Sequence, residues 1–298
     1  MPPRNIEYVP MIHLLSRLFR LRLALLNGVT ALGGVFLFPA PIRTGTLLAA
    51  FCGVTLLAMG GSAFNQLLER NLDALMTRTM LRPLPQGRLS AAAAALAGAC
   101  VILVALVLLT MTGGFLPPLL GLVATVWYLA VYTPLKCKTT LALPLGALCG
   151  AFPPLIGWAL AGGAPDDYRI ITLAGILFLW QIPHFWLLQE RHDADYRRAG
   201  VPLVAVGQGL LGLWIVALTA SSLMLPAFGL INRPAALWCA VFPAPLLVLA
   251  LMRSRKTLFI YLNLFPLLLT MSLFIAAAYH GGVDKLLLTI DSVFIYLY

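Results

Sequence analysis

The sequence has few charged residues: Asp, Glu, Lys and Arg together make up 10% of its 298 residues. Ten residues are acidic, 20 are Lys or Arg, and four are His. In soluble domains about a quarter of all residues are charged, so this shortage argues against a soluble protein. The net charge of +10 is explained by membrane topology and by attraction to anionic lipid or an anionic substrate. No nucleic-acid partner is expected.

Cysteine is also scarce and is not paired in the sequence. The five Cys stand alone, without any Cys-x-x-Cys spacing, so neither a zinc motif nor a disulfide framework is predicted. A cleavable signal peptide is not predicted either, because no small-residue cleavage site follows a short apolar core at the N-terminus. Residues 1–22 are instead expected to form a cytosolic amphipathic segment.

Hydrophobic residues are abundant, at 61% of the chain. Nine apolar stretches reach the length of about 20 residues that a helix needs to cross the hydrocarbon core. These stretches are residues 23–41, 45–64, 91–111, 115–134, 141–161, 170–188, 204–228, 235–252 and 257–279. Short connections rich in Gly, Pro or charge predict antiparallel neighbours. We predict one all-α polytopic membrane domain over residues 1–298, with a short apolar tail at 286–298 that lies at the membrane interface.

Basic residues are distributed unevenly between the two sides of the predicted bundle. Of the 20 Lys and Arg, 16 fall on the side of the N-terminus, and the other side has Arg43, Arg169, Arg233 and Lys285. Loops rich in Lys and Arg resist translocation. The N-terminus and the loops on its side are therefore predicted to lie in the cytoplasm.

Three oxygen-bearing side chains stand at regular spacing after the second apolar stretch. Asn65, Glu69 and Asp73 occupy positions i, i+4 and i+8, and each four-residue step on a helix turns only about 40° off alignment. The three side chains, called the acidic row below, therefore share one helix face. Carboxylate and carboxamide oxygens without His or Cys suit a hard cation such as Mg²⁺, which also binds water and phosphate oxygens. We predict a site for a metal-bound diphosphate.

Basic side chains follow the acidic row and recur in two further cytosolic loops. Arg78 and Arg82 lie in the same loop, Lys136 lies in the next one, and acids alternate with arginines at the end of residues 180–198. Guanidinium groups form forked hydrogen bonds with phosphate oxygens. The three loops are predicted to form one anion pocket.

Two further stretches accompany these loops. Residues 150–158 read Gly-Ala-Phe-Pro-Pro-Leu-Ile-Gly-Trp, and residues 180–185 read Trp-Gln-Ile-Pro-His-Phe, followed by Asp195-Tyr196. Together with the acidic row, Arg78-Thr79 and Arg82-Pro83, this combination resembles the protoheme IX farnesyltransferases (heme O synthases) of the UbiA prenyltransferase superfamily. The acidic row is typical of the whole superfamily, whereas the two stretches indicate the heme branch. The resemblance covers residues 20–280.

The resemblance implies a bundle of nine helices around a central cavity that opens to the cytosolic face of the bacterial inner membrane. The family transfers a farnesyl group from farnesyl diphosphate to a vinyl group of protoheme IX (heme B) and adds water, which gives heme O. Mg²⁺ is the implied cofactor. A downstream heme A synthase or terminal oxidase assembly factors are implied partners, besides the two substrates and membrane lipids.

The resemblance also assigns roles to individual residues. The implied metal ligands, which are also counted as catalytic, are Asn65, Glu69, Asp73 and Asp195. The implied diphosphate ligands are Arg78, Arg82, Lys136 and Arg191. The implied aromatic residues of the cavity are Tyr132, Trp158 and Phe185. His184 is a further catalytic candidate, either near the heme iron or as a base, although a single His after Pro at a helix end is often only structural.

The sequence departs from the family pattern at several positions. Asn71 replaces an aspartate that is common in the family, but position i+6 from Asn65 lies about 240° around a helix, away from the acidic row. Arg20-Leu21-Arg22 replaces a Lys-Pro pair at the start of the first apolar stretch. Activity is expected to survive the change at Asn71.

Two other functions are consistent with parts of the sequence. A prenyltransferase for a quinone precursor shares the acidic row, but it is expected to have a second Asp-x-x-x-Asp run that Asp193 and Asp195 do not provide. A membrane carrier of heme or another small molecule is a different class. No ionisable residue is predicted at mid-depth in the membrane, where transport paths commonly have one.

Overall fold

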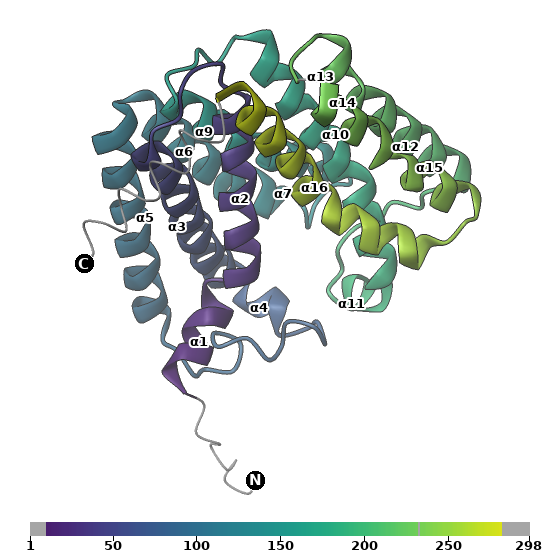
Figure 1. The fold of residues 1–298 in the computed structure, drawn as a ribbon. Coiled ribbons are helices and arrows are strands. Elements are labelled where there is room, and N and C mark those ends of the chain that lie inside the picture. The colour runs from purple at the N-terminus through teal and green to yellow at the C-terminus, as the bar shows by residue number, and fades with distance from the viewer. Residues whose placement is uncertain (1–9, 232, 282–298) are drawn as a thin grey trace, which may run out of the picture.

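The computed structural model describes residues 10–231 and 233–281, and this part of the chain contains helices and no strands. Long helices run side by side, and short helices lie at their ends (Figure 1). The helices are α1 (Met11–Leu18), α2 (Leu21–Leu37), α3 (Thr44–Leu68), α4 (Arg70–Asp73), α5 (Ala91–Gly113), α6 (Leu116–Val126), the π-helix η1 (Trp127–Tyr132), α7 (Thr133–Leu135), α8 (Ala142–Ala147), the 3₁₀-helix η2 (Leu148–Gly150), α9 (Phe152–Leu160), α10 (Tyr168–Arg191), α11 (Asp193–Arg198), α12 (Gln208–Ser222), α13 (Met224–Ala227), α14 (Arg233–Val241), α15 (Ala244–Leu251) and α16 (Arg255–Gly281). The all-α prediction is confirmed. The predicted tail at 286–298 lies outside the described residues.

The described residues contain seven helices that are long and apolar enough to cross a membrane, and eight if α1 and α2, which are bent by 52°, count as one span. The remaining predicted stretch corresponds to Ala235–Leu251, a shorter apolar helix. Large apolar side chains such as Leu96, Leu103 and Met111 are exposed on α5, as expected of a surface that contacts lipid tails. The protein is therefore an integral membrane protein. The predicted count of nine spans is not confirmed, because the described helices supply seven or eight by length and composition.

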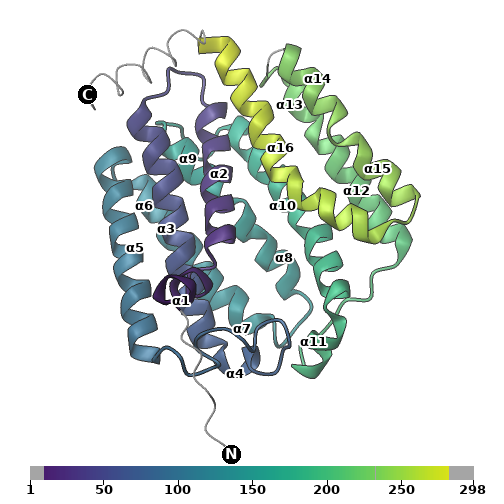
Figure 2. The same ribbon diagram turned by 60° about the horizontal axis from the view of Figure 1, so that its bottom comes forward.

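The N-terminal part of the chain turns sharply between α1 and α2. α1 is amphipathic, because apolar Leu18 is buried whereas polar His13 and Arg17 are exposed. Arg20, at the bend, has a left-handed backbone with φ of 47°, which non-glycine residues rarely adopt. Figure 2 shows α1 and α4 at the same end of the bundle as α11.

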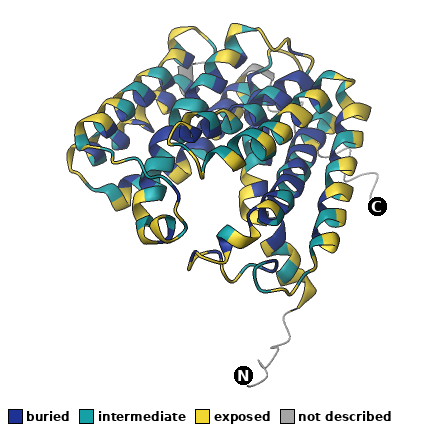
Figure 3. Cartoon of the chain, turned by 180° about the vertical axis from the view of Figure 1, so that it is seen from behind, coloured by how far each residue is buried: buried dark blue, intermediate teal, exposed yellow. Residues whose placement is uncertain are grey.

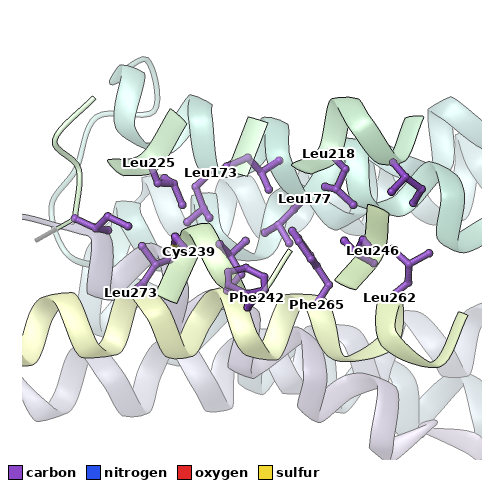
Figure 4. Packing of buried hydrophobic residues seen from close by; sticks show 14 of the residues in the cluster. Leu173, Leu177, Leu218, Leu225, Cys239, Phe242, Leu246, Leu262, Phe265 and Leu273 are labelled. Atoms are coloured by element: carbon purple, nitrogen blue, oxygen red, sulfur yellow. The ribbon is translucent and has the colours of Figure 1, made fainter. Parts of the chain in front are cut away.

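Buried residues lie where helices face one another, and exposed residues lie on the outer faces (Figure 3). The largest cluster joins α10, α12, α14, α15 and α16. Figure 4 shows Leu173, Leu177, Leu218, Phe242 and Phe265 interdigitating in this cluster. A second cluster joins α2, α3, α5 and α9.

α2 and α9 pack closely because each helix places a glycine against the backbone of the other helix. A Cβ atom on Gly34 would lie 1.9 Å from the carbonyl oxygen of Pro154, and one on Gly157 would lie 1.9 Å from that of Ala31. Only glycine fits at both positions. Small residues at such crossings are typical of helix packing in membranes.

The long helices α10 and α16 each contain an internal proline. In both, a tryptophan indole replaces the backbone hydrogen bond that the proline removes. A proline leaves the carbonyl four residues earlier without its helical partner. Pro183 in α10 frees the carbonyl of Leu179, which accepts a hydrogen bond from Trp214 Nε1 at 2.9 Å. Pro266 in α16 frees the carbonyl of Leu262, which accepts one from Trp180 Nε1 at 2.6 Å. The two indoles link α12 to α10 and α10 to α16.

Candidate active site

A cavity of about 390 Å³ lies between α2, α3, η1, α10 and α16. Along α3 its wall changes from apolar Val54 and Leu57 to polar Ser62 and Asn65. The wall then continues through Glu69 and Asp73 into the loop after α4. The cavity therefore has an apolar part within the bundle and a charged end, and its size is typical of small-molecule sites.

The three residues of the acidic row all line this cavity. α3 ends at Leu68 and α4 begins at Arg70, so Glu69 stands at a junction that the sequence pattern did not predict. Hydrogen bonds from Glu69 N to Asn65 O at 2.9 Å and from Asp73 N to Glu69 O at 2.7 Å keep the helical register across it. The exposed fractions of Asn65, Glu69 and Asp73 are 2%, 6% and 3%. Asn71 is exposed, in agreement with its predicted position off this face.

Both carboxylates of the row contact cationic side chains. Arg82 Nη1 donates to Asp73 Oδ2 at 2.6 Å, and Lys136 forms an ion pair with Glu69. Burial lowers the pKa of Arg82, whereas the charge of Asp73 raises it. Removing one partner of a buried ion pair costs about 3–5 kcal/mol. The stability of each carboxylate at this end of the cavity therefore depends on the cation paired with it.

The Asp195 carboxylate holds the loop that follows α4. Its Oδ1 accepts hydrogen bonds from Thr77 N at 2.9 Å and Thr77 Oγ1 at 2.6 Å, and its Oδ2 accepts one from Arg78 N at 3.1 Å. The hydrogen bond from the Thr77 hydroxyl, the two backbone hydrogen bonds and nearby Arg198 lower the pKa of Asp195 to about 2. Asp195 does not line the cavity. Its role as a metal ligand stays a prediction, and the structure gives it a second function, anchoring Arg78.

Replacing Asp195 by asparagine is expected to loosen residues 77–82. The asparagine offers one acceptor oxygen and places an NH₂ group against a backbone N–H. Loss of one or two hydrogen bonds to a charged acceptor, worth about 1.5–3 kcal/mol each, should raise tryptic cleavage after Arg78 by about tenfold or more.

The matched control is Asp193→Asn, since the partly exposed Asp193 forms its ion pair with exposed Arg197 and accepts no hydrogen bond from residues 77–82. Equal cleavage of both variants would contradict the anchoring role. Since the pKa of Asp195 is lowered on folding, the anchor is complete above pH 4 and is lost as the pH falls from about 4 towards 2.

In the described part of the chain, four cationic side chains line the cavity: Arg20, Arg78, Arg82 and Lys136. Arg20 was not predicted. It stands at the α1–α2 bend, which Gln66 fixes by donating from Nε2 to the carbonyls of Arg17 at 2.9 Å and Leu18 at 2.7 Å. Gln66, the residue after Asn65, therefore holds the bend that places Arg20 at the charged end of the cavity.

Three aromatic rings stack along one wall. Tyr128 and Tyr132 have centroids 6.0 Å apart, and Tyr132 and Phe185 lie 6.2 Å apart. All three residues line the cavity. Tyr132 and Phe185 were predicted there and Tyr128 was not, although it lies one helical turn before Tyr132.

The structure places Trp158 and Arg191 away from the cavity wall. Trp158 is buried against Phe38 at a centroid distance of 5.2 Å and donates from Nε1 to the carbonyl of Ala164 at 2.8 Å. Its indole closes the turn after α9 and does not line the cavity, so the role of Trp158 as a cavity aromatic stays a prediction. The Arg191 guanidinium lies 5.5 Å from the ring centroid of Phe259, and Arg191 does not line the cavity.

His184 lines the cavity between two aromatic rings. Its centroid lies 5.1 Å from that of Trp180 and 5.4 Å from that of Phe259. Among the described residues, its buried Nδ1 has no hydrogen-bond partner. Stacking therefore holds the imidazole, and within residues 10–231 and 233–281 no carboxylate or carbonyl fixes its tautomer.

The sequence profile of the UbiA prenyltransferase family matches residues 27–263, which is most of the chain. The chain belongs to the UbiA prenyltransferase family. It is 57% identical over 262 residues to the protoheme IX farnesyltransferase of Geobacter sulfurreducens, and the match covers 86% of this chain and 96% of that protein. The family predicted from the sequence is therefore confirmed, and the chain is a prenyltransferase.

Solved structures of UbiA homologues share this fold. The apo structure of the Aeropyrum pernix homologue has a TM-score of 0.67 at 19% identity and covers 86% of this chain and 98% of its own. The Archaeoglobus fulgidus homologue bound to GPP and Mg²⁺ has a TM-score of 0.60 at 14% identity and covers 89% and 99%. At these identities the likeness establishes the fold alone.

Proposed function

We propose that this UbiA enzyme transfers the farnesyl group of farnesyl diphosphate to a vinyl group of heme B and adds water, which gives heme O. The single observation that carries the proposal is a charged end joined to an apolar space in one cavity, formed by the acidic row, four cations and the wall of α3. The name of the 57% identical relative supports the choice of substrates.

The acidic row fits Mg²⁺ by the chemistry of its donors. Asn65, Glu69 and Asp73 offer hard oxygen atoms and no sulfur or imidazole, which is the ligand type that Mg²⁺ prefers. Both carboxylates are already paired with cations, so this wall attracts positive charge. GPP and Mg²⁺ in the Archaeoglobus fulgidus homologue support the same cofactor here. When bound, Mg²⁺ would neutralise charge on a departing diphosphate.

The cations of the cavity would bind the diphosphate. Lys136 and Arg82 contact carboxylates. When a metal and a diphosphate bind, the carboxylates would pair with the metal and the two cations with the diphosphate. Arg78 and Arg20 line the cavity without an ion pair among the described residues. Guanidinium forks match phosphate oxygens, so these residues hold the leaving group while the C–O bond breaks and its electron pair leaves with the diphosphate.

The apolar wall and the stacked rings suit the farnesyl side of the reaction. An allylic cation is quenched by bulk water and is attracted by the faces of aromatic rings. Tyr128, Tyr132 and Phe185 provide such rings beside the acidic row. The vinyl carbon of heme B forms the new C–C bond, and the resulting cation binds water and loses a proton. His184, with its unpartnered Nδ1, is the candidate to meet the porphyrin or to accept that proton.

We further propose nine membrane spans around this central cavity, with the N-terminus and the charged end on the cytosolic side of the bacterial inner membrane. The bent pair α1–α2 and the shorter Ala235–Leu251 supply the two spans beyond the seven long helices. The excess of Lys and Arg on the N-terminal side supports the orientation. A heme A synthase or a terminal oxidase assembly factor would then receive the product.

Incubation of the purified protein with heme B, farnesyl diphosphate and Mg²⁺ tests the proposal directly. Mass spectrometry is expected to show a porphyrin that has gained one farnesyl and one hydroxyl group, and EDTA is expected to prevent the gain. Unmodified but bound heme would indicate a carrier. Prenylation of 4-hydroxybenzoate, offered as an alternative acceptor, in place of heme would indicate an enzyme of a quinone pathway.

A further inference from the structure

We infer that Thr133 is a positioning residue that turns the Asn65 carboxamide so that its oxygen, and not its nitrogen, faces the metal and diphosphate. The inference rests on the proposed function, because it concerns how one residue of the acidic row becomes a ligand. A carboxamide can bind a cation only through its oxygen; its NH₂ group has two donors and no acceptor. The orientation of Asn65 therefore decides whether it contributes to the site.

The hydrogen bonds of Thr133 leave one orientation for Asn65. Thr133 Oγ1 lies 2.8 Å from the carbonyl oxygen of Tyr128, which can only accept, so the single hydroxyl proton lies there. The same Oγ1 lies 3.2 Å from Asn65 Nδ2. With its proton used, Thr133 can only accept from Asn65, and a flipped carboxamide would place two acceptors against each other. Asn65 Oδ1 has no hydrogen-bond partner within residues 10–231 and 233–281, and Asn65 lines the cavity.

The π-helix η1 creates this arrangement. Both the backbone N–H and the hydroxyl of Thr133 bond to the carbonyl of Tyr128, five residues earlier. Thr110, Thr125 and Thr172 lie in regular helices, and each hydroxyl bonds four residues back. The extra residue in the turn thus changes the partner of the Thr133 hydroxyl. Single π-turns of this kind are frequent at functional sites.

Burial makes the arrangement rigid. Thr133 is 5% exposed and Asn65 is 2% exposed, so water does not compete readily for either side chain. Lys136, three residues after Thr133, contacts Glu69. One short segment thus orients Asn65 and balances the charge of Glu69, so two members of the acidic row depend on it.

Binding of Mn²⁺ in the presence of inorganic diphosphate tests the inference without catalysis. Mn²⁺ is a paramagnetic substitute for Mg²⁺, so electron paramagnetic resonance reports the free ion. In the full-length protein, Thr133→Val is expected to raise the dissociation constant of Mn²⁺ by about 10- to 100-fold, as is typical when a group that orients a metal ligand is lost. Thr133→Ser keeps the hydroxyl and should bind as the parent does.

A rescue experiment separates orientation from general structure. Asn65→Asp in the Thr133→Val background presents oxygen in both orientations, so Mn²⁺ affinity should return to that of the parent. Thr110→Val is the control, because its hydroxyl bonds only within its own exposed helix face. It should bind Mn²⁺ as the parent does.

The outcomes distinguish the inference from the proposed function. If the parent does not bind Mn²⁺, or if Asn65→Leu binds it equally well, the metal role of Asn65 itself is wrong. If Asn65→Leu loses binding but Thr133→Val does not, or if the double variant stays weak, the orienting role of Thr133 is wrong while the metal site remains.

Discussion

Replacing Asp73 by asparagine is expected to lower farnesyl transfer by at least about 100-fold. The substitution keeps the size of the side chain and removes the negative charge. That charge lies on the cavity wall, is 3% exposed and is paired with Arg82. Without it, both the metal and the arginine beside the diphosphate lose their counter-charge. The measurement is turnover of heme B with farnesyl diphosphate and Mg²⁺, and EDTA should cause the same loss in the parent.

The control for this substitution is Asp193→Asn, which makes the same chemical change on α11. Asp193 contacts exposed Arg197 and does not line the cavity, so turnover should be close to that of the parent. Thermal unfolding of the Asp73 variant shows whether unpaired Arg82 destabilises the fold. Near-normal turnover both in Asp73→Asn and with EDTA would remove the metal assignment.

Replacing Arg78 by lysine is expected to raise the KM for farnesyl diphosphate by about 10- to 100-fold and to leave the KM for heme B nearly unchanged. A lysine keeps the charge but cannot form the forked pair of hydrogen bonds that guanidinium makes with phosphate. Loss of one charged hydrogen bond, worth about 1.5–3 kcal/mol, gives this range. The backbone bond from Arg78 to Asp195 does not involve the changed side chain, so the loop should stay in place.

Arg88→Lys is the matched control, because Arg88 lies exposed later in the same loop and does not line the cavity. It should leave both KM values as they are. If Arg78→Lys weakens both substrates equally, the effect reflects general disruption and the diphosphate assignment fails.

Much of this architecture follows from hydropathy alone. Each of the nine apolar stretches coincides with one or more helices, because in a bilayer the backbone must form its hydrogen bonds internally. Interruptions within those stretches were not predictable. The junction at Glu69, the π-helix η1 and the bend at Arg20 depend on tertiary contacts, such as those of Gln66 and Thr133, that leave no periodic signal.

The candidate site was predictable where spacing carries the chemistry. The members of the acidic row share one wall because positions i, i+4 and i+8 lie on one helix face, and Arg78 and Arg82 reach the same end of the cavity from the loop after α4. Residues that act through the fold were harder to recognise. The resemblance assigns Asp195 to the metal, which stays a prediction, but its anchoring role was not predicted: its three hydrogen bonds come from Thr77 and Arg78. The resemblance places Trp158 in the cavity, but the sequence does not show that its indole donates a hydrogen bond to the carbonyl of Ala164.

The two indole hydrogen bonds to proline-freed carbonyls make Trp180 and Trp214 irreplaceable by other large apolar residues. Phenylalanine would fill most of the same volume and supply no proton, and hydrocarbon has no solvent molecule to take its place. In each case the indole N–H satisfies a backbone carbonyl that the internal proline leaves without its helical partner. Because Trp180 also stacks on His184, one indole contacts both the carbonyl that Pro266 frees in α16 and the imidazole in the cavity.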